Sequence, residues 1–227
     1  MAKKKDKEII KGWWDDLAPW YEHDTIPTEA AQYGAYCPNE TKLGLLGDVR
    51  GKALIELGCG GAQCSIAFSK AGAVCTGVDI SEGQLDHARR LSIEQGVDIE
   101  LLQNDIQDLQ FLRGRVFDIA FSAYAFQYVS DLRKLFEGVK QCLTDGGLLV
   151  FSCHHPFTEC IDKETLKLKR SYHELDRDEY EDSWPDGSSR PFLRYLRRVS
   201  DYHDALVQSG FIVDRVVEAV DWDEPGR

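Results

Sequence analysis

The residues best suited to chemistry lie where the apolar run Ala53-Leu54-Ile55-Glu56-Leu57 breaks into Gly58-Cys59-Gly60-Gly61-Ala62. Glycines in such a turn let a ligand approach the backbone where a side chain would collide with it. About 20 residues later, Asp79 ends a second apolar run, and a carboxylate there can accept hydrogen bonds from ribose hydroxyls. Together they predict a nucleotide-like ligand at the carboxyl ends of two strands.

Two alternatives compete for this turn. In the dinucleotide fingerprint G-x-G-x-x-G the third glycine would fall at position 63, which is Gln63, and no hydride-transfer group is apparent. A nicotinamide cofactor is therefore disfavoured. A tight structural turn that binds nothing is the other alternative, and the carboxylate in register with the glycines argues against it.

Two histidines follow the last of the apolar runs, in Cys153-His154-His155-Pro156. Open α/β sheets bind ligands at this edge, and an imidazole there could take the proton from an attacking hydroxyl or amine. His155 is the favoured general base, and the alternative is that one histidine packs inward while the other caps the strand end. A metal site could be imagined from Cys153, His154, His155, Cys160 and His173, but their spacing fits no standard zinc signature, so no metal is predicted.

The elements that must position these groups are five short apolar runs, typical of buried strands. They lie at Ala53–Leu57, Val74–Val78, Ile99–Leu102, Phe117–Phe121 and Gly147–Phe151. Helical patterns separate them. Ser81 and Gln84 form a capping-box pattern in which each side chain would bond the other's backbone N–H, and Ser130 or Asp131 precedes a helix that ends at Asp145-Gly146-Gly147.

Strands alternating with helices predict an α/β fold: a Rossmann-like, doubly wound, mostly parallel sheet with helices on both faces. We expect one domain over residues 1–227, with its core at 50–155. The flanking parts are an aromatic capping helix at 8–23, a lid or exposed hairpin at 157–195, and a helix from Ser200 with a strand over Phe211–Val220, together 198–220.

Composition excludes several classes of partner. The net charge of −12 disfavours nucleic acid and anionic lipid, and no stretch approaches the roughly 18 consecutive apolar residues of a membrane helix. The basic N-terminus has no apolar run after it, so no secretion signal is predicted. The seven cysteines are scattered, and a chain of this length needs no disulfide bonds to be stable, which indicates reduced thiols and a cytoplasmic protein.

Glu56-Leu57-Gly58-Cys59-Gly60 resembles the first motif of class I S-adenosylmethionine-dependent methyltransferases, in the UbiE-like small-molecule group. The resemblance covers residues 53–155 in the family's order. It includes Asp79, Asn104-Asp105-Ile106, Phe117-Asp118 through Tyr128-Val129, and Leu143-Thr144-Asp145-Gly146-Gly147-Leu148-Leu149.

The resemblance implies an S-adenosylmethionine site. The backbone around Gly58 and Gly60 would hold the methionine moiety, Asp79 the ribose, and Asp105 with Ile106 the adenine. Ser122 would lie beside the sulfonium. Glu56, Leu57, Cys59 and Ile80 complete the implied cofactor set, and Tyr21, on the leading helix that closes over the cofactor in the family, would lie nearest the methyl-transfer site.

The chain departs from the family at two places. Ala62 stands where the family has a third glycine, and no seventh strand is visible after Phe211–Val220, so we expect a missing or substituted strand. The implied function is methyl transfer to an O, N or C atom of a small molecule by a monomer or homodimer. The alternative is a regulatory or degenerate protein that binds S-adenosylmethionine without transferring its methyl group.

Overall fold

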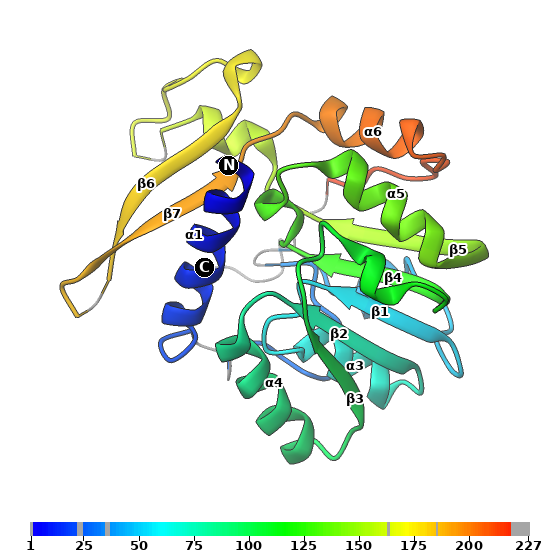
Figure 1. Ribbon diagram of the computed structural model, residues 1–227. Coiled ribbons are helices and arrows are strands. Elements are labelled where there is room, and N and C mark those ends of the chain that lie inside the picture. The colour runs from blue at the N-terminus through cyan, green and yellow to red at the C-terminus, as the bar shows by residue number, and fades with distance from the viewer. Residues whose placement is uncertain (1, 22–24, 35–36, 163, 185, 219–227) are drawn as a thin grey trace.

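The main sheet contains five parallel strands in the order β3-β2-β1-β4-β5 (Figure 1). The computed structural model describes residues 2–21, 25–34, 37–162, 164–184 and 186–218. The strands are β1 (Ala53–Leu57), β2 (Val74–Asp79), β3 (Ile99–Gln103), β4 (Phe117–Ala123) and β5 (Leu143–Ser152). All five predicted strands and the Rossmann-like parallel arrangement are thereby confirmed.

Both faces of the central strands β1, β2 and β4 are largely buried. The helices are α2 (Glu40–Leu43), α3 (Gln63–Lys70), α4 (Glu82–Glu94), α5 (Leu132–Cys142) and α6 (Val199–Gln208). Leu54 of β1 belongs to the same buried cluster as Phe68 of α3, whereas Ile55 belongs to the cluster that contains Phe136 of α5. Because successive side chains of a strand point to opposite faces, an uninterrupted apolar run suits a doubly covered sheet.

The predicted helix starts are confirmed, with one difference. Asp131 Oδ1 accepts a hydrogen bond from Lys134 N at 3.1 Å, and Ser81 Oγ accepts one from Gln84 N at 3.1 Å. The reciprocal half of the capping box is not formed, because the buried side-chain amide of Gln84 has no hydrogen-bond partner among the described residues. The helix expected from Ser200 is instead capped by Arg198.

The N-terminal helix and a hairpin form a second layer at the carboxyl ends of the strands (Figure 1). α1 spans Ala2–Leu17, so it starts and ends earlier than the expected 8–23, of which residues 22 and 23 lie outside the described part. Pro19 limits its extension. The predicted hairpin is the antiparallel pair β6 (Arg177–Ser183) and β7 (Ser189–Tyr195). Short 3-10 helices are η2 (Leu109–Leu112), η3 (Phe126–Tyr128), η4 (Pro156–Cys160) and η5 (Tyr172–Glu174).

The strand expected over Phe211–Val220 is not formed in its described part. Residues 211–218 belong to no strand, and 219 and 220 lie outside the described residues. A strand needs a neighbour with which to exchange backbone hydrogen bonds. β5 is the last strand at this side of the described sheet, but residues 211–218 do not pair with its open edge: the cavity continues between them, and Ile212 is 94% exposed.

Candidate functional site

A cavity of about 1430 Å³ runs along the carboxyl ends of the strands and continues between β5 and residues 210–218. The glycine turn and both predicted carboxylates, Asp79 and Asp105, line it at one edge of the sheet. The predicted cofactor residues that line it are Glu56, Gly58, Cys59, Gly60, Asp79, Ile80, Asp105 and Ile106, and Tyr21 and His155 also reach it. Residues far apart in the sequence therefore surround one cavity.

Two members of the predicted set do not line this cavity. Leu57 and Ser122 are fully buried, and Ser122 Oγ donates a hydrogen bond to the Leu57 carbonyl at 2.7 Å. This contact ties β4 to β1. The side chain of Ser122 therefore does not point to the place the family resemblance implied, and Ala123, Tyr124 and Ala125 line the cavity instead.

The glycine turn has a left-handed backbone at three positions. Gly58 has φ 73°, and a Cβ there would lie 2.2 Å from the Cβ of Ala125, so glycine lets the loops after β1 and β4 meet. Gly60 has φ 51°, and Ala62 adopts φ 60° although it is not glycine. Ala62 is fully buried in a small cluster with Leu85, so its methyl contact offsets part of the backbone strain.

Two buried carboxylates lie beneath the turn. Asp79 accepts hydrogen bonds from the backbone N–H of Gly60 at 2.8 Å and of Ser81 at 2.9 Å, yet burial raises its pKa. Glu56 accepts from the backbone N–H of Ser65 at 2.8 Å. Burial, reinforced by the negative charge of Asp79, raises the pKa of Glu56 to about 7. Glu56 therefore holds α3 against β1 and is partly protonated near neutral pH.

The N-terminal helix α1 closes the end of the cavity near Asp105. Lys7 Nζ lies 3.2 Å from Asp105 Oδ2. Farther along the helix, Asp15 Oδ1 accepts a hydrogen bond from Ser81 Oγ at 2.7 Å. Gly83 permits this approach, because a Cβ there would lie 2.9 Å from the Cβ of Ala18. The start of α4 therefore contacts both the cavity and the helix that covers it.

Aromatic rings line a second part of the cavity, the aromatic end. Trp14 meets Tyr21 and Tyr128 edge to face, with ring centroids 5.9 and 5.5 Å apart. Tyr124 has φ 56°, and its ring lies 4.5 Å from that of His154. A Cβ on Gly34 would lie 1.5 Å from Tyr124 Cε2, so the ring of Tyr124 occupies the space that glycine leaves.

His155 is placed differently from the expectation. Its Nδ1 accepts a hydrogen bond from Phe157 N at 3.2 Å, so the neutral ring carries its proton on Nε2, which faces Glu218 Oε1 at 2.7 Å. Both ring nitrogens are thus engaged in capping η4 and in the contact with Glu218. His155 therefore caps η4, whereas the exposed His154 is the histidine whose ring contacts Tyr124 in the cavity wall.

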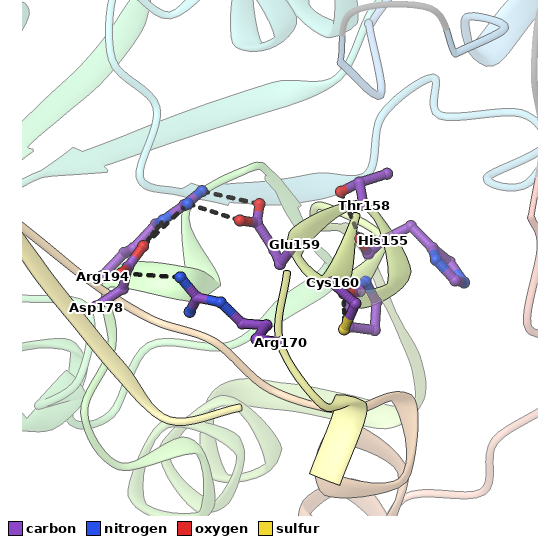
Figure 2. Close-up of polar contacts among 8 residues, drawn as sticks. His155, Thr158, Glu159, Cys160, Arg170, Asp178 and Arg194 are labelled. Atoms are coloured by element: carbon purple, nitrogen blue, oxygen red, sulfur yellow. Dashed lines mark hydrogen bonds and ion pairs between the residues drawn. The ribbon is translucent and has the colours of Figure 1, made fainter. Parts of the chain in front are cut away.

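Arginines at the end of β7 hold the loops that border this aromatic end. Arg194 donates two hydrogen bonds to Glu159 of η4, at 3.0 and 2.8 Å, and also contacts Asp178 of β6 (Figure 2). Figure 2 shows the His155 ring pointing away from this ion cluster. Arg197 donates to the carbonyl of Phe126 at 3.5 Å. The hairpin is therefore connected to the segments after β4 and after β5.

Several cavity residues were missed by the sequence reasoning. They are Gln84, Tyr124 and Gln127, of which Gln84 and Gln127 have buried side-chain atoms without a partner among the described residues. Tyr124 and Gln127 lie within the stretch from Phe117 to Val129 that resembles a family motif, but the resemblance gave neither of them a role. For Gln84 the sequence pattern was misleading, because the capping box predicted that its side-chain amide bonds the helix backbone.

Comparison with known proteins assigns the family. Residues 55–151 match the model of the methyltransferase domain family. A solved S-adenosylmethionine-dependent methyltransferase from Mesorhizobium loti is 28% identical with a TM-score of 0.63, covering 77% of this chain and 81% of that one. Residues 55–151 therefore form a methyltransferase domain, and the chain is similar to S-adenosylmethionine-dependent methyltransferases.

The methyltransferase is also similar to two curated proteins. An uncharacterised protein of Haemophilus influenzae is 27% identical over 82% of this chain and 77% of its own length. A ubiquinone biosynthesis O-methyltransferase of Pasteurella multocida is 26% identical over 65% of this chain. The methyltransferase spans only 62% of the length of that relative.

The cofactor of the methyltransferase is S-adenosylmethionine. The residues present fit it: the turn is open beside Gly60, carboxylates stand at the ends of β2 and β3, and the buried amide of Gln84 faces the same cavity. All seven cysteines lie in the described part of the chain and are free thiols. In the described part of the chain, no helix is long and apolar enough to cross a membrane, and no group of three or more His, Cys, Asp and Glu side chains is placed to hold a metal.

Proposed function

We propose that the protein methylates a hydroxyl oxygen on a small, partly aromatic acceptor. The observation that carries the proposal is the single cavity in which the glycine turn and two carboxylates meet a chamber of tyrosine rings. Aromatic walls favour a planar, partly apolar molecule. The O-methyltransferase relative supports an oxygen acceptor.

Different residues of the chain would bind the different parts of the cofactor. The backbone of Gly58 and Gly60 would hold the methionine moiety, Asp79 the ribose, and Asp105 with Ile106 the adenine. When bound, S-adenosylmethionine supplies a methyl group on a sulfonium whose leaving group is a neutral thioether. The protein therefore needs mainly to align the acceptor in line with that bond and to exclude water.

Residues at the aromatic end would orient the acceptor and move its proton. Tyr21 and Tyr128 would bracket the ring of the acceptor. The Gln127 Oε1, buried without a partner among the described residues, would accept a hydrogen bond from it. His154 would take the hydroxyl proton, because an imidazole titrates near neutral pH and His154 lines the cavity beside Tyr124.

The test is transfer of labelled methyl from S-adenosylmethionine to a panel of phenols and catechols, with primary amines in parallel. We expect label in the hydroxyl compounds. Label only in amines would contradict the oxygen assignment. Tight binding of S-adenosylhomocysteine without transfer to any acceptor would favour the alternative of a binding protein without transferase activity.

A variant tests the proposed base. His154→Ala should lower kcat by roughly 100-fold and remove the acidic limb of its pH profile. The affinity for S-adenosylhomocysteine should stay unchanged, because the product lacks the acceptor. His173→Ala, at an exposed position on η5, is the matched control and should leave both measurements unchanged. An unaltered pH profile in His154→Ala would remove His154 from the reaction.

A further inference from the structure

The side chain of Gln84 is an unusual feature of the cavity wall. It stands in the first turn of α4 and is 1% exposed, yet neither its Nε2 nor its Oε1 has a hydrogen-bond partner among the described residues. It also lines the cavity. A buried amide with both groups unpaired destabilises a protein, since it has lost its hydrogen bonds to water and gained none.

The cap of α4 explains why this amide is available. In a complete capping box, the side chain at this position would bond back to the N-cap backbone N–H. Here the backbone N–H of Ser81 donates to Asp79 Oδ1 at 2.9 Å instead. Asp79 thus takes the place that the capping-box pattern reserved for Gln84, and the amide of Gln84 extends toward the glycine turn.

The surroundings of the amide define the ligand chemistry. A Cβ on Gly60 would lie 3.6 Å from Gln84 Oε1, and the N–H of Gly60 donates to Asp79 Oδ2 at 2.8 Å. Gln84 and Asp79 therefore flank the same glycine. One donor and one acceptor beside a carboxylate match two adjacent hydroxyls, each of which can both donate and accept.

We propose that Gln84 binds the ribose diol of the cofactor together with Asp79, its amide supplying one donor and one acceptor to the two hydroxyls. The proposal rests on the adenosyl cofactor and is independent of the acceptor. It assigns a cofactor contact to a residue whose sequence pattern indicated only a helix cap. The same contact makes the ligand-free protein less stable and the loaded protein more stable.

The experiment is calorimetric titration of the full chain and of Gln84→Met with S-adenosylhomocysteine and with its 2′-deoxy and 3′-deoxy analogues. Methionine keeps the length of the side chain but cannot form these hydrogen bonds. We expect Gln84→Met to bind S-adenosylhomocysteine roughly 10-fold more weakly than the native chain. At least one deoxy analogue should lose clearly less affinity on this substitution. Ligand-free Gln84→Met should unfold at a higher temperature than the native chain.

Ser92→Ala is the control, since it removes a buried polar group of the same helix that does not line the cavity. It should leave all three affinities unchanged. An equal loss for all three ligands in Gln84→Met, or no loss at all, would overturn the contact with the diol. Failure of the native chain to bind S-adenosylhomocysteine would overturn this inference together with the cofactor site. The expected smaller loss for a deoxy analogue would support the inference even if the protein transferred no methyl group.

Discussion

The two ends of the cavity are built in different ways. At the cofactor end, the two buried carboxylates bond backbone groups close in sequence: Gly60 and Asp79 are 19 positions apart, and Ser65 and Glu56 are 9 apart. The layer that covers the cavity, formed by α1 and the hairpin, is instead held by contacts between distant segments. Tyr195 donates to Asp6 across 189 positions, and Arg190 contacts Asp16 across 174.

The difference also concerns the chemical groups involved. The cofactor end uses backbone N–H groups, glycines and buried carboxylates, which depend little on side-chain identity outside one motif. The covering layer depends on ion pairs and rings, such as Arg177 with Asp6 at 2.9 Å and Trp13 with Phe192 at 4.8 Å. The cofactor end is therefore built mainly from backbone groups, and the covering layer mainly from side chains.

Gly58→Ala should have the largest effect, because it adds a methyl to a left-handed residue 2.2 Å from the Cβ of Ala125. We expect a loss of about 3 kcal/mol in the free energy of unfolding, together with loss of S-adenosylhomocysteine binding. Urea denaturation and calorimetry measure these. Gly96→Ala, where φ is 67° and a Cβ would meet nothing within 4 Å, should lose only about 1 kcal/mol. Equal losses would show that backbone strain alone matters.

Glu56→Gln tests the buried carboxylate beneath the turn. The pKa of Glu56 is raised from 4.5 to about 7, so the folded state holds its proton more tightly than the unfolded state. Its contribution to stability is present below pH 4.5 and is lost as the pH rises through about 7, by about 3 kcal/mol. The free energy of unfolding, measured from pH 5 to 8, should therefore fall less steeply with rising pH in Glu56→Gln than in the native chain. Identical slopes would contradict the raised pKa.

Arg194→Met tests the covering layer alone. It leaves Glu159 without this cation and Asp178 with the longer contact to Arg170 at 3.8 Å, so we expect a loss of about 2 kcal/mol in the free energy of unfolding. The affinity for S-adenosylhomocysteine should change less than twofold. Arg133→Met, which breaks an exposed pair with Glu137, should lose less than about 0.5 kcal/mol. A large loss of cofactor affinity in Arg194→Met would show that the two ends are not separate.

Gly83→Ala should have the smallest effect on global stability, within about 1 kcal/mol, because better helix propensity offsets the new contact with Ala18. The added methyl should displace α1 locally. We expect amide hydrogen exchange in α1 to become several-fold faster. Gly12→Ala, where a Cβ would meet nothing within 4 Å, should slow exchange in the same helix. Unchanged exchange in Gly83→Ala would mean that α1 is not seated on this glycine.

Much of the cofactor end could be predicted from the sequence. The strands from Ala53–Leu57 to Gly147–Phe151, the glycine turn and the acid at Asp79 all follow from periodicity and spacing over short distances. Ser122 was misplaced because a strand position does not reveal which face its side chain takes. The strand over Phe211–Val220 was wrong in its described part, because an apolar run cannot supply its own ladder partner.

The sequence by itself determined the parallel core and the position of the glycine turn with its acid, because uninterrupted apolar runs and glycine turns are local properties of the chain. Only the tertiary structure decided what Gln84, His154 and His155 do. The Ser81 backbone can bond either Gln84 or Asp79, and a histidine after a strand can cap or face the cavity. Such choices depend on the competing partners that folding brings near, which neighbouring residues in the sequence do not specify.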